Sequence, residues 1–411
     1  MYYGGSAKAE PRKAATGMPP LIDLGVAESY PTVGPILRAE GLTAVVAEAA
    51  QAAVAGASPV AMYPQPENWL LREAIATVMA ENVFRAEGAT AHEIVVTGGA
   101  TAALEALVFA ICSRGDALIV PAPLYPAFYI DVGMRAGVEI IPTDPDQALD
   151  LEVLQQAARR AHGMGKKLRG VLYTSPCNPR GIVHTREEAA AIERFVVEND
   201  LELVYDAVYA GTAYDEELAA AAAPRLAVEH QRKLHTIWGL SKDFGLSGWR
   251  VGVVHSHNPH VIEALEPQMR FGGASRLALA CSLALLQDPT RARHCLRLAA
   301  DALRMRMKAG RRALLDGGVP AEALAGSVPG AGPLDLIDFG AVQSAENRPP
   351  LDEEALWVAI LEAGVHVVRG QACGVSRPGA VRVCWGAANS DEEAGEAGRR
   401  IAAAYLLERE K

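Results

Sequence analysis

The sequence predicts an α/β fold in which a mostly parallel central sheet is flanked by helices and joined to a smaller α+β domain at the C-terminus. Between residues 94 and 255, short apolar runs alternate with helical segments, the rhythm of β-α-β units. After residue 290, a long Arg- and Ala-rich helix leads into more widely spaced strands. We therefore expect three parts: an N-terminal arm with part of the small domain (1–60), a large domain (61–290) and a small C-terminal domain (291–411).

The individual elements follow from the apolar runs and from helical periodicity. Each run is short and continuous, which is typical of strands buried on both faces of a sheet. In the large domain the predicted strands are 94–96, 117–120, 138–142, 170–173, 201–205, 234–238 and 250–255, and the predicted helices are 70–84, 101–112, 151–162 and 186–199. The last two strands flank a Gly/Ser-rich turn without a helical pattern, so we expect them to be adjacent. In the small domain we expect a helix at 291–315 and strands at 333–339, 365–368 and 380–384, whereas residues 1–18 are assigned no secondary structure.

The composition limits the kinds of partner. The 411 residues carry a net charge of −10 and a mean hydropathy of +0.09, so there is no basic surface for nucleic acid or anionic membrane. The longest apolar run is too short to span a bilayer. Six cysteines lie far apart without a C-x-x-C pair, which argues against a zinc ribbon or a disulfide framework. We expect a cytoplasmic protein that binds small molecules.

Polar residues gather where the predicted parallel strands end, the edge at which such sheets bind ligands. Gly98 and Gly99 open a helix whose backbone N–H groups can hold a phosphate, although a plain turn explains them equally well. Asn178 lies in a loop stiffened by prolines, which can present it as an amide donor, although a structural turn explains this loop about as well. Asp206 ends a strand, where a carboxylate needs a cation such as a protonated ring nitrogen. Lys242 is either a snorkelling surface lysine or a desolvated amine suited to Schiff-base chemistry.

The types and spacing of these residues resemble the fold type I pyridoxal 5'-phosphate (PLP) enzymes of the class I/II aminotransferase superfamily. The resemblance implies PLP as the cofactor. It implies three catalytic residues: Lys242, which forms the Schiff base and removes the Cα proton, Asp206, which pairs with the ring nitrogen, and Tyr125, which stacks on the ring. The cofactor-binding residues that it implies are Ala100, Thr101, Tyr125, Asn178, Asp206, Tyr209, Ser241, Lys242, Arg250 and Tyr63.

Several segments resemble the 1-aminocyclopropane-1-carboxylate (ACC) synthases, which convert S-adenosylmethionine (SAM). They are 24–28 (LGVAE), 98–105 (GGATAALE), 121–128 (PAPLYPAF) and 376–384 (SRPGAVRVC). This resemblance implies that Arg382 binds the substrate carboxylate and that Glu28 meets a sulfonium or amino group. It also implies a homodimer with shared active sites, in which Tyr63 reaches the neighbouring subunit's substrate site. Gly239 departs from the pattern, because the family has a hydroxyl side chain there.

The implied reaction is Cα deprotonation of an α-amino acid, with γ-elimination or γ-substitution on SAM. Small residues at Gly239, 272–274 and Gly386 suggest a widened site. There a second small-molecule substrate could capture the quinonoid, with C–C bond formation (annulation), in specialised metabolism. Transamination with 2-oxo acids needs the same lysine, aspartate and arginine and is the alternative. A non-catalytic PLP-fold binding module is a second alternative.

The run from His255 to His260 contains three histidines and invites comparison with a metal site. We expect the histidines at this strand end to point to opposite faces, and Asn258 with Pro259 to start a helix as N-cap and first-turn proline. No metal site is therefore expected. The Arg-rich stretch 304–312 is expected to be an exposed helix face.

Overall fold

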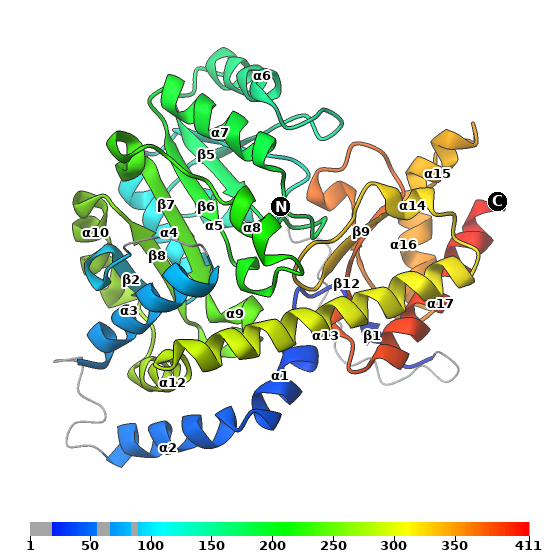
Figure 1. Cartoon of the computed structure of the whole chain (residues 1–411). Coiled ribbons are helices and arrows are strands. Elements are labelled where there is room, and N and C mark those ends of the chain that lie inside the picture. Colours follow the sequence, from blue (N-terminus) through cyan, green and yellow to red (C-terminus); the bar gives the residue numbers. More distant parts are fainter. Residues whose placement is uncertain (1–18, 56–65, 84–88, 411) are drawn as a thin grey trace.

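A seven-stranded sheet forms the centre of the computed structural model, which describes residues 19–55, 66–83 and 89–410 (Figure 1). The strand order is β2-β8-β7-β6-β5-β3-β4, and β8 alone runs against the other strands of this sheet. The strands are β2 (Ile94–Thr97), β3 (Ala117–Val120), β4 (Glu139–Pro142), β5 (Leu168–Thr174), β6 (Glu202–Asp206), β7 (Leu234–Gly239) and β8 (Gly252–Ser256). This arrangement confirms the predicted α/β fold and the adjacency of the last two strands.

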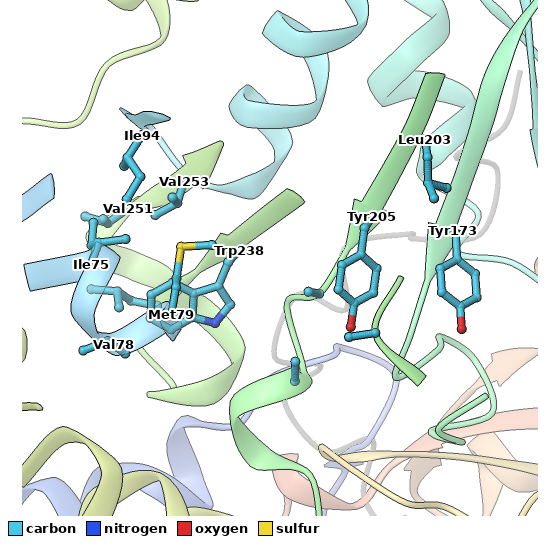
Figure 2. Close-up of a cluster of buried hydrophobic side chains, with 14 of the residues drawn as sticks. Ile75, Val78, Met79, Ile94, Tyr173, Leu203, Tyr205, Trp238, Val251 and Val253 are labelled. Carbon is cyan, nitrogen blue, oxygen red and sulfur yellow. The ribbon is translucent and has the colours of Figure 1, made fainter. Parts of the chain in front are cut away.

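Successive residues of each strand pack against opposite layers of helices, because side chains alternate along a strand. Tyr173 and Leu203 face one layer, whereas Leu172 and Val204 face the other. Figure 2 shows part of the first cluster, where Trp238 lies against Ile75 and Met79. The first layer contains α3 (Pro66–Val78), α6 (Leu151–Gly163), α7 (Arg186–Glu198) and α12 (Arg276–Leu286), and the second contains α4 (Ala100–Ile111), α5 (Phe128–Gly133) and α10 (Pro259–Leu265).

Side-chain caps define many of the helix starts. At α7, the Thr185 hydroxyl accepts a hydrogen bond from the Glu188 amide, and the Glu188 carboxylate accepts one from the Thr185 amide, which forms a capping box. Asn258 caps α10 as expected. The predicted helix 70–84 begins earlier, at Pro66, and ends in a π-helical turn, Met79–Val83. The helices outside the two layers and before residue 289 are α1 (Tyr30–Ala39), α2 (Leu42–Ala55), α8 (Glu216–Ala222), α9 (Leu240–Asp243) and α11 (Met269–Gly272).

A second hydrophobic cluster forms around the C-terminal half of α13 (Pro289–Asp316), which runs beneath the sheet toward α17 (Asp391–Arg409) (Figure 1). Leu296 and Leu303 of α13 belong to the core of the large sheet, whereas Met307 and Leu314 belong to the second cluster. The helix therefore joins two cores. The domain boundaries at residues 60 and 290 stay predictions.

Two small sheets frame this second cluster. One has the order β11-β12-β9, and the other pairs β1 with β10 in parallel. The predicted strand 365–368 is therefore wrong in detail, because it divides into two strands of different sheets. The elements are β1 (Ile22–Asp23), β9 (Leu334–Asp338), β10 (Val365–His366), β11 (Val368–Arg369), β12 (Ala380–Cys384), α14 (Glu322–Ala325), α15 (Phe339–Ala345), α16 (Glu353–Glu362) and α17 (Asp391–Arg409).

Two further expectations need correction. The sequence predicts a non-helical turn between β7 and β8, but this turn contains α9. Asp243 accepts hydrogen bonds from Trp238 and Thr212 there and so closes a tight turn. The Arg-rich stretch of α13 is not wholly an exposed face. Arg306 donates to the carbonyl of Ala388, and Arg311 donates to the buried carboxylate of Asp335.

Among the described residues, no single helix is both long and apolar enough to cross a bilayer. One bent pair, Pro259–Gly272 with Arg276–Leu286, has the length and composition of a span only when the two helices are taken together.

Candidate active site

A pocket opens at the carboxyl edge of the parallel strands. The ends of β5, β6 and β7 are in register there, because Thr174 pairs with Asp206 and Asp206 pairs with Ile237. The pocket encloses about 840 Å³, including open solvent at its mouth. Its lining brings together most of the predicted site residues, namely Ala100, Thr101, Tyr125, Asn178, Asp206, Tyr209, Ser241, Lys242 and Arg250. Tyr63 lies outside the described residues.

Lys242 lies on α9, directly after β7, and its amine reaches into the pocket. Nζ donates a hydrogen bond of 2.5 Å to the carbonyl of Ala27. Burial lowers the pKa of Lys242, while the nearby Glu28 carboxylate acts in the opposite direction. A lysine with a lowered pKa is more often neutral, which suits an amine that acts as a nucleophile or a base.

Asp206 is a buried carboxylate at the end of β6. Burial raises the pKa of Asp206 to about 7, and the hydrogen bond from the Val208 amide only partly opposes this effect. Within the described residues no lysine, arginine or histidine side chain lies within ion-pair distance of its oxygens. A protonated ring nitrogen would supply the missing cation. The buried Asp206 carboxylate at this end of the pocket therefore fits the nitrogen of a pyridine ring.

The other end of the pocket can hold an anion. Gly99 has φ +100° and places the Ala100 amide at the first turn of α4, where a helix N-terminus favours a phosphate. Arg250 takes the left-handed conformation, φ 55°, and packs over the turn, since a Cβ at Gly99 would lie 2.5 Å from Arg250 Nη2. The Thr101 and Ser241 hydroxyls line the same pocket.

Arg382 and Glu28 lie beside the pocket and not in its lining. Arg382, on β12, is only 4% exposed, and its Nη1 donates to Asn178 Oδ1 over 3.3 Å. Its Nε is buried and makes no hydrogen bond to the described residues, so a donor is available for a carboxylate. Glu28 accepts hydrogen bonds from the Ser247 hydroxyl and from the Ser29 amide.

Some lining residues escaped the sequence analysis. Thr174 ends β5 exactly as Asp206 ends β6, and its buried hydroxyl makes no hydrogen bond to the described residues. The same strand-end argument would have found it had the predicted strand been one residue longer. Asp131 lies on α5, which was not predicted, and burial raises the pKa of Asp131 to about 6. Ser247 lies in a 3-10 turn within the segment expected to be non-helical.

The expected widening of the site by small residues is wrong at three positions. A Cβ at Gly239 would lie 2.8 Å from the Val251 carbonyl oxygen, and one at Gly273 would lie 2.5 Å from the Met269 carbonyl oxygen. One at Gly386 would lie 2.5 Å from the Pro333 side chain. These glycines permit close backbone packing and do not enlarge the pocket. Gly272 differs, because its Cβ would meet no atom closer than 3.8 Å.

The expected orientation of the histidines after β8 is also wrong. The rings of His255 and His257 contact each other edge to face, with centroids 4.8 Å apart. Residues two apart on a strand share a face, so the two side chains point the same way. Both rings lie near Glu93, which the sequence analysis did not consider.

Comparison with known proteins agrees with this geometry. The family model for aminotransferase class I and II matches residues 35–401. The chain is 34% identical over 309 residues to 1-aminocyclopropane-1-carboxylate synthase 3 of Oryza sativa subsp. japonica, which covers 71% of this chain and 68% of that protein. It is 31% identical to the probable aminotransferase ACS12 of Arabidopsis thaliana, over 95% of this chain and 80% of that protein.

Solved structures share the fold. Aspartate aminotransferase from Thermus thermophilus superposes with a TM-score of 0.72 at 26% identity and covers 94% of this chain and 92% of that one. An archaeal alanine:glyoxylate aminotransferase superposes with a TM-score of 0.78 at 20% identity, over 94% of this chain and 91% of that one. The fold is fold type I, the cofactor is PLP, and the resemblance to ACC synthases is confirmed. The chain belongs to the class I and II aminotransferase family of PLP-dependent enzymes.

Proposed function

We propose that this enzyme acts on SAM by removing the Cα proton and releasing the γ-sulfur. The observation that carries the proposal is the position of the Glu28 carboxylate beside the pocket, where it accepts a hydrogen bond from the hydroxyl of the lining residue Ser247. Its charge partly opposes the lowering of the pKa of Lys242 by burial. A sulfonium is a permanent cation, and the electrostatic attraction of a nearby carboxylate stabilises such a cation more strongly in a partly buried site than in water. The similarity to an ACC synthase at 34% identity supports the same substrate class.

The roles of the side chains follow from their positions around the pocket. PLP, when bound, supplies an electron sink for the electron pair left at Cα. Asp206 would hold a proton on the ring nitrogen, and Asn178 and Tyr209 would hydrogen-bond to the phenolic oxygen. Tyr125 would pack on the face of the ring. The phosphate would bind to the Ala100 amide and to the side chains of Thr101, Ser241 and Arg250, all of which line the pocket.

The reaction that we propose balances without an outside oxidant. Lys242 Nζ takes the Cα proton, and Arg382 fixes the substrate carboxylate in a bidentate pair. The Cγ–S bond breaks, and its electron pair leaves on sulfur as neutral methylthioadenosine. The electron pair left at Cα forms the new bond to Cγ and closes a three-membered ring. For capture of a second small molecule, a proton also leaves Cβ as the sulfur departs; the nucleophile then adds to Cγ, and protons return to Cβ and Cα.

Transamination is the second candidate. The similarity to an aspartate aminotransferase at 26% identity favours it, and it uses Lys242, Asp206 and Arg382 in the same positions. In that case the amino group moves to the cofactor and then to a 2-oxo acid.

We also propose a homodimer with shared active sites. Helix α2 is apolar on most of its circumference and largely exposed, although an all-round apolar helix is normally covered. It lies next to α12 (Figure 1), and exposed apolar side chains continue on Phe271 and Leu277. A second copy of the chain would cover this face, with Tyr63 contributing to the partner's pocket. A concentration-independent dimeric mass in light scattering tests this proposal.

The deciding experiment incubates the holoenzyme with SAM and measures methylthioadenosine. Its release supports γ-elimination or γ-substitution, and the amino-acid product then separates ring closure from capture of a second molecule. No release, together with conversion of the cofactor to its amino form by an amino-acid panel, would instead establish transamination. Glu28→Gln sharpens the test, because it removes the charge and keeps the size.

We expect Glu28→Gln to raise KM for SAM about tenfold, which corresponds to about 1.4 kcal/mol. Binding of the uncharged thioether S-adenosylhomocysteine should change much less. Ser247→Ala is the matched control, since it removes the hydroxyl that donates to Glu28 and leaves the carboxylate charged. If Glu28→Gln weakened the binding of SAM and of S-adenosylhomocysteine by the same factor, the proposed contact with a sulfonium would be refuted.

A further inference from the structure

Three potential metal ligands converge at the edge of the large sheet, away from the pocket. Glu93 ends the 3-10 turn that precedes β2, and His255 lies on β8 opposite Ile94 in the antiparallel ladder. His257 follows directly after β8. One ligand atom from each of the three side chains lies within 4.8 Å of the other two.

His255 is the least satisfied member of the group. The residue is 4% exposed, and its Nε2 is buried without a hydrogen-bond partner among the described residues. That nitrogen points toward Glu93, with 3.9 Å between Nε2 and Oε2.

Glu93 and His257 are already oriented toward the same point. His257 Nδ1 lies 2.7 Å from Glu93 Oε1. The second carboxylate oxygen accepts hydrogen bonds from the Thr90 amide and hydroxyl, at 2.9 and 3.0 Å. Such supporting hydrogen bonds fix the direction of a ligating carboxylate.

We propose that Glu93, His255 and His257 bind a divalent transition-metal ion, with Zn²⁺ as the best match. Two imidazoles and one carboxylate, with a fourth position open to water, form a recurrent Zn²⁺ ligand set. Ligand atoms at about 2.0–2.2 Å from a tetrahedral metal lie roughly 3.3–3.6 Å from one another. The present separations are 2.7 Å between Glu93 Oε1 and His257 Nδ1 and 3.9 Å between Glu93 Oε2 and His255 Nε2. All three ligand atoms lie within 4.8 Å of one another, so small side-chain shifts would complete the site.

The site lies at the opposite end of β2 from the phosphate turn. Because the four residues of β2 lie between them, roughly 16 Å of extended chain separates Glu93 from Gly98. A metal ion there would not touch the reacting atoms. The ion would link the N-terminal end of β2 to the C-terminal end of β8. The opposite ends of these two strands lead to Gly99 and Arg250.

The test measures Zn²⁺ binding to the holoenzyme prepared without a histidine tag. Equilibrium dialysis with metal analysis gives the stoichiometry and the affinity, and Co²⁺ in place of Zn²⁺ reports the ligand geometry through its visible absorption. The informative variants are Glu93→Gln and His257→Gln, because both side chains are about a quarter exposed and their replacement leaves the buried His255 in place. The matched control is His260→Gln, since His260 belongs to the same segment and has its own acidic neighbour, Glu263, but is 82% exposed.

We expect one Zn²⁺ per chain in the native protein and in His260→Gln. Each informative variant should lose more than about tenfold in affinity, since even the loss of a supporting partner costs 10–100-fold. Absence of stoichiometric Zn²⁺ in the native protein would overturn the proposal. So would stoichiometric binding that survives both Glu93→Gln and His257→Gln, because the ion would then lie elsewhere.

Discussion

Replacing Asp206 with asparagine should make the PLP-free protein more stable and the PLP-bound protein less stable. The pKa of Asp206 is raised from 3.8 to about 7, chiefly by burial. A carboxyl with a raised pKa binds its proton more tightly in the folded state than in the unfolded state. Folding therefore loses stability as the pH rises from about 4 to about 7, and the loss is complete above that range.

The magnitude follows from the size of the shift. About three pKa units at about 1.4 kcal/mol each amount to about 4 kcal/mol at about pH 8 and to about 1 kcal/mol at about pH 4.5. An amide in the same place carries no charge and avoids this cost. With PLP bound, a protonated ring nitrogen would offset the cost in the native protein but could not pair with asparagine.

Urea unfolding of the PLP-free proteins at equal concentration measures the effect through the transition midpoints at these two pH values. Asp243→Asn is the control. Burial also raises the pKa of Asp243 to about 7, but its oxygens accept hydrogen bonds from Trp238, Thr212 and Gly211. By the same linkage Asp243→Asn should also relieve a pH-dependent cost near pH 8, but the donors that lose an acceptor oppose this gain by about 1–3 kcal/mol. We therefore expect a smaller net stabilisation near pH 8 than for Asp206→Asn. If Asp206→Asn lowers the midpoint near pH 8, or shifts it equally at both pH values, the reasoning is refuted.

Three further substitutions test the pocket. Lys242→Ala should remove the visible absorption of the lysine-bound cofactor and slow Cα deprotonation about 10²–10⁴-fold in single-turnover kinetics; retained exchange of the Cα proton would contradict its role. Gly99→Ala should weaken PLP binding about tenfold in dialysis, because φ +100° and the Arg250 side chain both oppose a Cβ there, and an unchanged affinity would disprove the tight turn. Arg382→Lys should lower kcat/KM for the amino-acid substrate about 10–100-fold with little effect on PLP affinity, since a bidentate charged pair is lost; unchanged kinetics would exclude it as the carboxylate anchor.

The strand-end residues show how far the sequence alone can be taken. Apolar runs located the ends of β6 and β7 closely enough to find Asp206 and Lys242, because the carboxyl edge of a parallel sheet gathers polar residues whatever the loop details. The same reasoning missed Thr174 by one residue, since strand boundaries depend on pairing partners that the sequence does not display.

Contacts between distant segments were harder to predict. Arg382 and Asn178 are 204 positions apart and meet through one hydrogen bond, so only family resemblance brought them together beforehand. The sequence suggests open space at Gly239 and Gly386, but both glycines are closely packed. A sequence does not show whether a glycine makes room for a ligand or for a neighbouring part of the chain. Glu93 escaped notice because its partners lie across an antiparallel ladder.

The long helix α13 has a mechanical consequence for the pocket. Its 28 residues extend about 42 Å, and its two halves are embedded in different cores, with Leu303 in one and Met307 in the other. The strand that bears Arg382 moves with the second core, whereas Lys242 and Asp206 move with the first. Any opening or closing between the two cores must therefore bend a continuous helix within a single turn. The distance between Arg382 and the Lys242 amine should for this reason resist change, with no flexible hinge between them.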